Sequence, residues 1–145
     1  MRIASLAIVF CDRPDWIVER LKQTQTLCAL FCGDMAVHTA QQVSDLMPDL
    51  LPYIATKPGE AYERVLDAVR FTQRYHMEAD TIIVLCPAAR ALEIALLIRH
   101  FQKIQQVWCK SEISIEASGW EPGGLPEDAW ATFATWRRIR RAERS

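Results

Sequence analysis

The chain has 145 residues, of which 50% are hydrophobic and 24% charged, and its formal net charge is −1. This composition is typical of a single globular domain and excludes a disordered or collagen-like chain. The apolar run over residues 3–10 is too short to span a bilayer and lacks the cleavage pattern of a signal peptide, so we expect a cytoplasmic protein without membrane contact.

Alternating apolar runs and stretches of helical period extend along the whole chain. Taken in order, the predicted elements are a strand over residues 3–10, a helix over 15–23, a strand over 26–32, a helix over 35–47, a weak strand over 51–55, a helix over 60–75, a strand over 81–85, a helix over 88–101, a short strand over 106–109, an edge strand over 113–117 and a basic helix over 127–144. A loop with paired glycines over residues 120–126 precedes the last helix.

Three of these elements have informative faces. The helix over residues 60–75 has one apolar face, and its charged residues, Arg64 among them, fall largely on the other face. The helix over residues 88–101 is apolar almost all round, so we expect it to be buried. The strand over residues 113–117 alternates isoleucine with polar residues, which predicts an edge strand with one wet face.

Strands that alternate with helices, most of them continuously apolar, predict a three-layer α/β/α fold. We expect a mainly parallel sheet of about five to six strands in one domain, with an antiparallel direction left open for the last, edge strand.

The five cysteines are odd in number and scattered, at positions 11, 28, 32, 86 and 109. This pattern argues against a disulfide framework and fits a reducing compartment. No CxxC pair occurs, so we expect no zinc site. Four of the cysteines end predicted strands, where either a thiol site or simple apolar packing would place them.

In parallel sheets, ligands bind beyond the carboxyl ends of the strands. The residues that we expect at this edge, and that are therefore candidates for holding a ligand, are Cys11, Asp12, Arg13, Asp34, Lys57, Cys86 and Arg90. A thiolate phosphatase loop would need arginine six residues after its cysteine, but Leu92 stands there. Glycine-rich phosphate and dinucleotide fingerprints are also absent, so we expect no cofactor.

Several segments resemble the histidine phosphatase (phosphoglycerate-mutase-like) superfamily. Residues 33–41 are similar to its segment after the second strand, residues 59–65 to its Gly-Glu-Ser helix start, and residues 82–92 to its strand followed by Ser-His-Gly-Gly and Arg-Ala-Leu. Residues 113–116 with Trp130 resemble its last strand and tryptophan. The strand and Arg-Ala-Leu helix also resemble the YdcF-like envelope family, although that family's histidine before the arginine is missing.

The resemblance lacks the superfamily's chemistry. Where the family has the nucleophilic histidine of Arg-His-Gly, this chain has Phe10-Cys11-Asp12. The position of the family's second histidine is occupied by Cys86-Pro87. The arginine that clamps phosphate after the second strand has no counterpart near Ala36. The resemblance therefore implies a degenerate, non-catalytic member.

Three functions follow from these observations. The missing nucleophile favours a non-catalytic binding or protein-interaction module on a histidine-phosphatase-like scaffold. Its partner would be a protein, a second copy of the chain or a small anionic ligand, and the five tryptophans would supply an interface or fill the core. The first alternative is a small enzyme of hydrolase or phosphatase type that uses the cysteine, aspartate and arginine side chains at the strand ends.

The second alternative is contact with an acidic partner, or less readily with nucleic acid, through the basic end of the chain. The arginines that would make this contact are Arg137, Arg138, Arg140 and Arg141.

Overall fold

A computed structural model describes residues 2–118 of the chain. In chain order, the elements are β1 (Arg2–Val9), α1 (Pro14–Gln23), β2 (Cys28–Cys32), α2 (Ala36–Leu46), β3 (Leu51–Ala55), α3 (Ala61–Arg74), β4 (Glu78–Pro87), the 3₁₀ turn η1 (Ala88–Arg90), α4 (Ala91–Gln105) and β5 (Glu112–Ser118). The predicted basic helix over residues 127–144 and the arginines in it lie outside the described residues.

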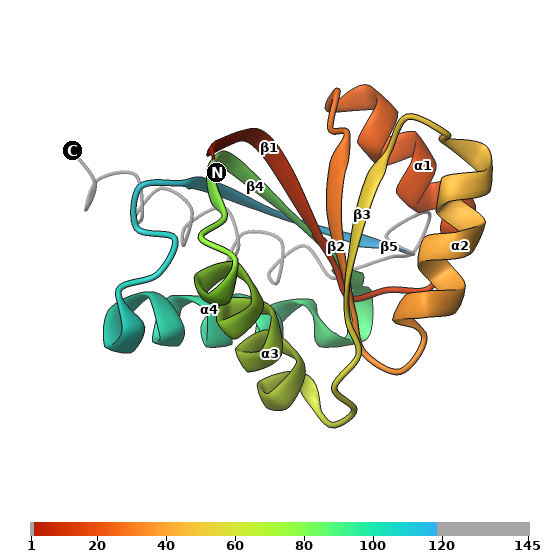
Figure 1. The fold of residues 1–145 in the computed structure, drawn as a ribbon. Coiled ribbons are helices and arrows are strands. Elements are labelled where there is room, and N and C mark those ends of the chain that lie inside the picture. Colours follow the sequence, from red (N-terminus) through yellow and green to blue (C-terminus); the bar gives the residue numbers. More distant parts are fainter. Residues whose placement is uncertain (1, 119–145) are drawn as a thin grey trace.

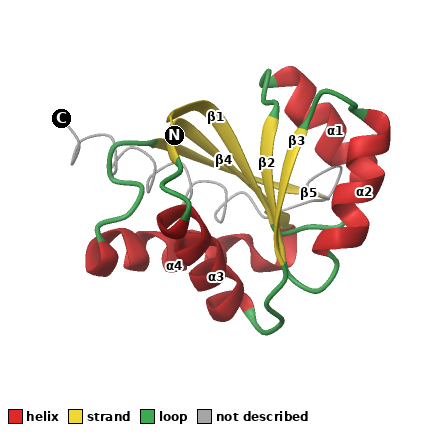
Figure 2. Ribbon diagram, in the orientation of Figure 1, coloured by secondary structure: helices red, strands yellow, loops and turns green. Residues whose placement is uncertain are grey.

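The five strands form one sheet in the order β3-β2-β1-β4-β5, and every neighbouring pair is parallel. The helices cover both faces, with α1 and α2 on one side and α3 and α4 on the other (Figure 1), and Figure 2 shows the strands as the layer between them. The predicted three-layer α/β/α fold is confirmed. The antiparallel direction left open for the last strand is wrong, because β5 runs parallel to β4.

Two apolar clusters hold the layers together, one on each face of the sheet. Alternate residues of β1 serve both clusters: Leu6 and Ile8 pack toward α3 and α4, while Ala7 and Val9 pack toward α1 and α2. A central parallel strand buries both faces in this way, which explains why its sequence is continuously apolar. Within residues 2–118, no helix is long and apolar enough to cross a membrane.

The short strand predicted over residues 106–109 does not form. Gln106 and Trp108 have φ of 50° and 58°, in the left-handed region, so the segment leaves α4 in a turn and does not extend. Residues 112–118 form the edge strand instead, and its predicted wet face is confirmed because Ile113 and Ile115 are buried while Ser114 is partly exposed.

The prediction that the helix over residues 88–101 is buried holds for one side of the helix only. In α4, Ile94 and Ile98 are buried, whereas Leu92 and Leu96 are 41% and 57% exposed. A helix in an outer layer can turn only one side to the sheet, so apolar residues on its other side stay exposed.

Candidate functional site at the carboxyl edge of the sheet

The strand order identifies where a ligand site is expected. The chain proceeds from β1 to β2 and β3 on one side and then continues with β4 and β5 on the other side of β1. The reversal leaves a crevice between the carboxyl ends of β1 and β4, the usual ligand position in open parallel sheets. Phe10 follows β1 there, and its backbone N–H donates to the carbonyl of Leu85, 2.7 Å away.

Two small cavities occupy this edge. A cavity of about 240 Å³ is bordered by the ends of β1 and β2 and the start of α2. A second cavity, of about 180 Å³, is bordered by the starts of α3 and α4. Phe10, Arg64 and Pro87 line both cavities and therefore divide the crevice. Each cavity is smaller than the about 300–1,000 Å³ that is common for small-molecule sites, so each fits a small group.

Arg64 is the cation at the centre of this arrangement. It lies in the first turn of α3, and its Nη2 is 3.9 Å from Asp34 Oδ1, too long for a strong ion pair. Its Nε is buried and has no hydrogen-bond partner among residues 2–118. The guanidinium packs against Gly33, where a Cβ would lie 3.3 Å from Nε and where φ is +99°, so glycine suits both the backbone and the neighbour.

The sequence interpretation missed Arg64 because it assigned this side chain to the outer face of its helix. Arg64 could have been identified from its position in the first turn of a helix that starts at the carboxyl edge. The same kind of position made Arg90 a candidate. Arg90 does line the smaller cavity. However, Glu93 and Glu60 lie 3.2 Å and 3.7 Å from its guanidinium and already neutralise it.

Three cysteines meet at this edge, as the sequence predicted: Cys11, Cys32 and Cys86 lie at or just beyond the ends of β1, β2 and β4. Burial raises the pKa of Cys11 from its ordinary value of 9.0 to about 12, although the backbone N–H of Arg13 favours the thiolate. Burial also raises the pKa of Cys32 and Cys86. These thiols are protonated at neutral pH and are therefore poor nucleophiles.

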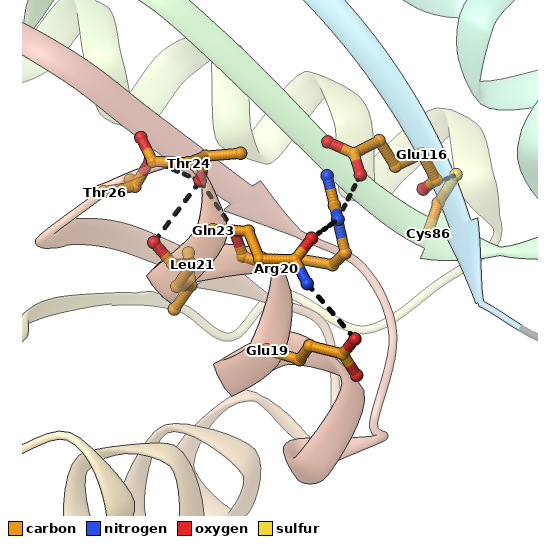
Figure 3. A network of polar contacts seen from close by, with 8 residues as sticks. All are labelled: Glu19, Arg20, Leu21, Gln23, Thr24, Thr26, Cys86 and Glu116. Carbon is orange, nitrogen blue, oxygen red and sulfur yellow. Dashed lines mark hydrogen bonds and ion pairs between the residues drawn. The ribbon is translucent and has the colours of Figure 1, made fainter.

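Cys86 is held away from both cavities. Its Sγ–H donates to the backbone carbonyl of Glu116 on β5, 3.5 Å away (Figure 3). The side chain of the same Glu116 forms an ion pair with Arg20 of α1. This ion pair connects the edge strand β5 to the helix layer of α1 and α2, whereas Cys86 packs on the other face of the sheet. Cys86 is thus a packing residue of the β4–β5 pair, and Pro87 lines the crevice in its place.

The expectation that Cys109 ends a strand at the carboxyl edge is wrong. Because residues 106–109 form no strand, Cys109 does not stand at a carboxyl end but precedes β5 at the amino edge of the sheet. Its side chain is exposed there and lines a different cavity, of about 380 Å³. That cavity is larger than either of the two carboxyl-edge cavities, but it lies at the edge opposite to the helix starts, so we assign the candidate site to the switch point.

The remaining candidates divide between the crevice and the surface. Asp12 and Asp34 line the larger carboxyl-edge cavity together with Cys11. Arg13 and Lys57 line neither cavity. Arg13 is exposed where α1 begins, and the backbone N–H of Lys57 donates to Asp67 Oδ2, 3.1 Å away.

Within residues 2–118 the structure offers no group of side chains for a metal ion, and the arginines expected to contact nucleic acid lie elsewhere in the chain. Among the described residues, no group of three or more histidine, cysteine, aspartate or glutamate side chains could hold a metal ion. The contact expected from the C-terminal arginines stays a prediction, since they lie beyond residue 118.

Comparison with known proteins adds no relative: no family model, no curated protein and no solved structure matches the chain.

Proposed function

We propose that the protein is a non-catalytic binding module that holds a small anionic group at Arg64 in the carboxyl-edge crevice. The observation that carries this proposal is the guanidinium of Arg64, which borders both cavities and whose buried Nε–H has no acceptor in the part of the chain that the structure describes. A buried donor without a partner costs about 1–3 kcal/mol, and an oxyanion within hydrogen-bonding distance would relieve that cost.

The start of α2 supports an anion in the same cavity. Ala36 and Thr39, in the first turn of α2, line the same cavity as Arg64. The backbone N–H groups of Ala36 and Thr39 already bond to the carbonyls of Gly33 and Met35, so α2 supports an anion through its dipole, whose positive end favours negative charge. No side-chain hydrogen bond caps this helix.

Two observations favour binding without turnover. The crevice thiols are protonated at neutral pH, as the raised pKa of Cys11 illustrates. None of the three histidines lines either cavity: His38 is exposed on α2, His76 lies at the amino edge, and His100 packs beside Phe101 on α4. The crevice therefore lacks both an activated thiol and an imidazole base.

The histidine-phosphatase-like origin of the scaffold remains part of this proposal. Cys11 and Cys86, which the resemblance aligns with the family's two histidines, follow or end the adjacent strands β1 and β4. The free thiols likewise support the cytoplasmic location expected from the sequence.

The test is a titration with inorganic phosphate at low ionic strength, followed by amide chemical shifts. We expect shifts at residues 33–39, and an affinity lower by about 10- to 100-fold in Arg64→Met, since a charge-assisted hydrogen bond contributes about 1.5–3 kcal/mol. Arg70→Met is the matched control, because Arg70 is an exposed arginine of the same helix.

Equal phosphate affinity in the two variants would contradict the assignment to Arg64. A phosphatase assay with p-nitrophenyl phosphate tests the enzyme alternative. Turnover by the wild-type protein that disappears in Cys11→Ser would refute the non-catalytic reading and favour thiol chemistry at the crevice.

A further inference from the structure

The largest of the four cavities described for residues 2–118, about 380 Å³, lies at the amino edge of the sheet. The end of α3, the start of β4 and the segment 106–111 between α4 and β5 form its walls. Figure 1 shows this segment on the side of the molecule where the N-terminus lies. The cavity is independent of the carboxyl-edge crevice, because no residue lines both.

One wall of this amino-edge cavity is Trp108, which is buried in an unfavourable backbone conformation. Its φ is 58°, and the left-handed region costs an L-residue about 1–2 kcal/mol. Two buried side chains hold the residue there. The indole Nε1–H donates to Thr72 Oγ1 at 3.0 Å, and the backbone carbonyl accepts from Gln102 Nε2 at 3.2 Å.

The other left-handed residues near this cavity end helices, whereas Trp108 opens a turn in which its carbonyl also accepts the N–H of Ser111, 3.3 Å away. His76 follows α3, where the N–H of Met77 bonds to the carbonyl of Thr72 and the N–H of His76 to that of Gln73, the pattern of a helix C-terminal cap. Gln106 is the left-handed residue that ends α4. Trp108 ends no helix, and strain of this kind is concentrated at binding sites.

The lining of the cavity combines an apolar wall with an available cation. Met77, Val107 and Trp108 supply apolar surface. Arg2 also lines the cavity, but it is engaged by Glu78 and Asp80.

Lys110 differs from Arg2 in that no acid of residues 2–118 forms an ion pair with it. It is exposed, lines the cavity and forms no ion pair within residues 2–118. Its ammonium group is therefore free to contact the charged end of a ligand whose apolar part lies against Trp108.

We propose that the amino-edge cavity is a second binding site, which takes a small anion with a flat apolar body, such as an aromatic carboxylate. The ring packs against Trp108, Met77 and Val107, and the carboxylate lies toward Lys110. The volume falls in the range of about 300–1,000 Å³ that is common for small-molecule sites. The buried hydrogen bonds of Trp108 form this wall before the ligand arrives, which lowers the entropic cost of binding.

The test compares three probes: 2-naphthoate, its neutral analogue 2-naphthamide, and acetate. Cys109 lines the cavity and is exposed, so its rate of alkylation by iodoacetamide, measured by peptide mass spectrometry, reports occupancy. Cys28, which is half-buried and lines none of the four cavities, is the internal reference. We expect 2-naphthoate to slow alkylation of Cys109 and not of Cys28, and acetate to have no effect.

Substitution of Lys110 tests the contribution of its charge, with two control variants. Lys110→Gln should weaken 2-naphthoate about fivefold, the effect of one ion pair at about 4 Å in water, and leave 2-naphthamide unchanged. Lys103→Gln, an exposed lysine on α4 that does not line the cavity, should change neither. Arg64→Met should also leave 2-naphthoate binding intact, so this site can fail or succeed independently of the carboxyl-edge site.

Protection of Cys109 that is no stronger with 2-naphthoate than with acetate would overturn the proposal. Equal protection by 2-naphthoate and 2-naphthamide, together with an unaffected Lys110→Gln variant, would overturn its anionic part.

Discussion

Replacing Thr72 by valine should destabilise the protein by about 2 kcal/mol. Thr72 is 2% exposed, and its Oγ1 accepts the indole N–H of Trp108 at 3.0 Å. Valine has nearly the same shape, so the substitution leaves no cavity but leaves a buried N–H without an acceptor, at a cost of about 1–3 kcal/mol. Urea unfolding measures the change, and with a typical slope of about 1–3 kcal/mol per molar the midpoint should fall by about 1 M.

A double-mutant cycle with Trp108→Phe isolates the hydrogen bond from packing. Trp108→Phe removes the donor, while Thr72 Oγ1 retains its own bond to the carbonyl of Val69, 2.9 Å away. The double variant has no orphaned N–H, so its loss should be smaller than the sum of the single losses by about 1–2 kcal/mol. A Thr72→Val variant within about 0.5 kcal/mol of wild type, or additive single losses, would refute the claim that this bond holds Trp108 in place.

Three further outcomes can be measured. Gln106→Gly should raise the free energy of unfolding by about 0.5–1 kcal/mol, because glycine avoids the left-handed penalty at φ 50°, and an unchanged urea midpoint would contradict this. The pKa of Cys11 rises from 9.0 to about 12 on folding, so the stability that its protonated thiol contributes is complete below pH 9. Between pH 9 and 12 the free energy of unfolding should fall by up to about 1.4 kcal/mol per pH unit. Cys11→Ala should flatten this alkaline decline, and parallel pH profiles of the variant and the wild type would contradict the prediction. Asp34→Asn should raise phosphate affinity about fivefold by removing a carboxylate 3.9 Å from Arg64 Nη2, and a weaker complex would argue against an anion in that cavity.

The positions of most elements could be predicted from the sequence because they depend on local patterns. Continuous apolar runs marked the buried strands, and apolar residues at helical spacing marked the helices. The error at residues 106–109 has a physical reason: the segment is apolar because Val107 and Trp108 are buried, but they are buried in a turn. Burial alone does not distinguish a strand from a loop that is held by side-chain hydrogen bonds.

The candidate site was only partly predictable. The sequence identified Cys11, Cys32 and Asp34 as strand-end residues, and the structure brings them to one cavity. It did not identify Arg64, because the helical pattern alone does not show which first-turn side chain turns over the edge of a sheet. Nor did it indicate that Glu60 and Glu93 would neutralise Arg90.

The sequence by itself determined the alternation of strands and helices, and hence a parallel sheet whose strand ends share one edge, because the period of apolar residues is set by local backbone geometry. Only the tertiary structure decided the strand order, which makes β1 and β4 neighbours and creates the crevice at their ends. It also decided that Arg64 borders that crevice and that burial keeps the thiols protonated. These properties depend on distances between residues far apart in the chain and on exclusion of water, and neither is encoded in a local pattern.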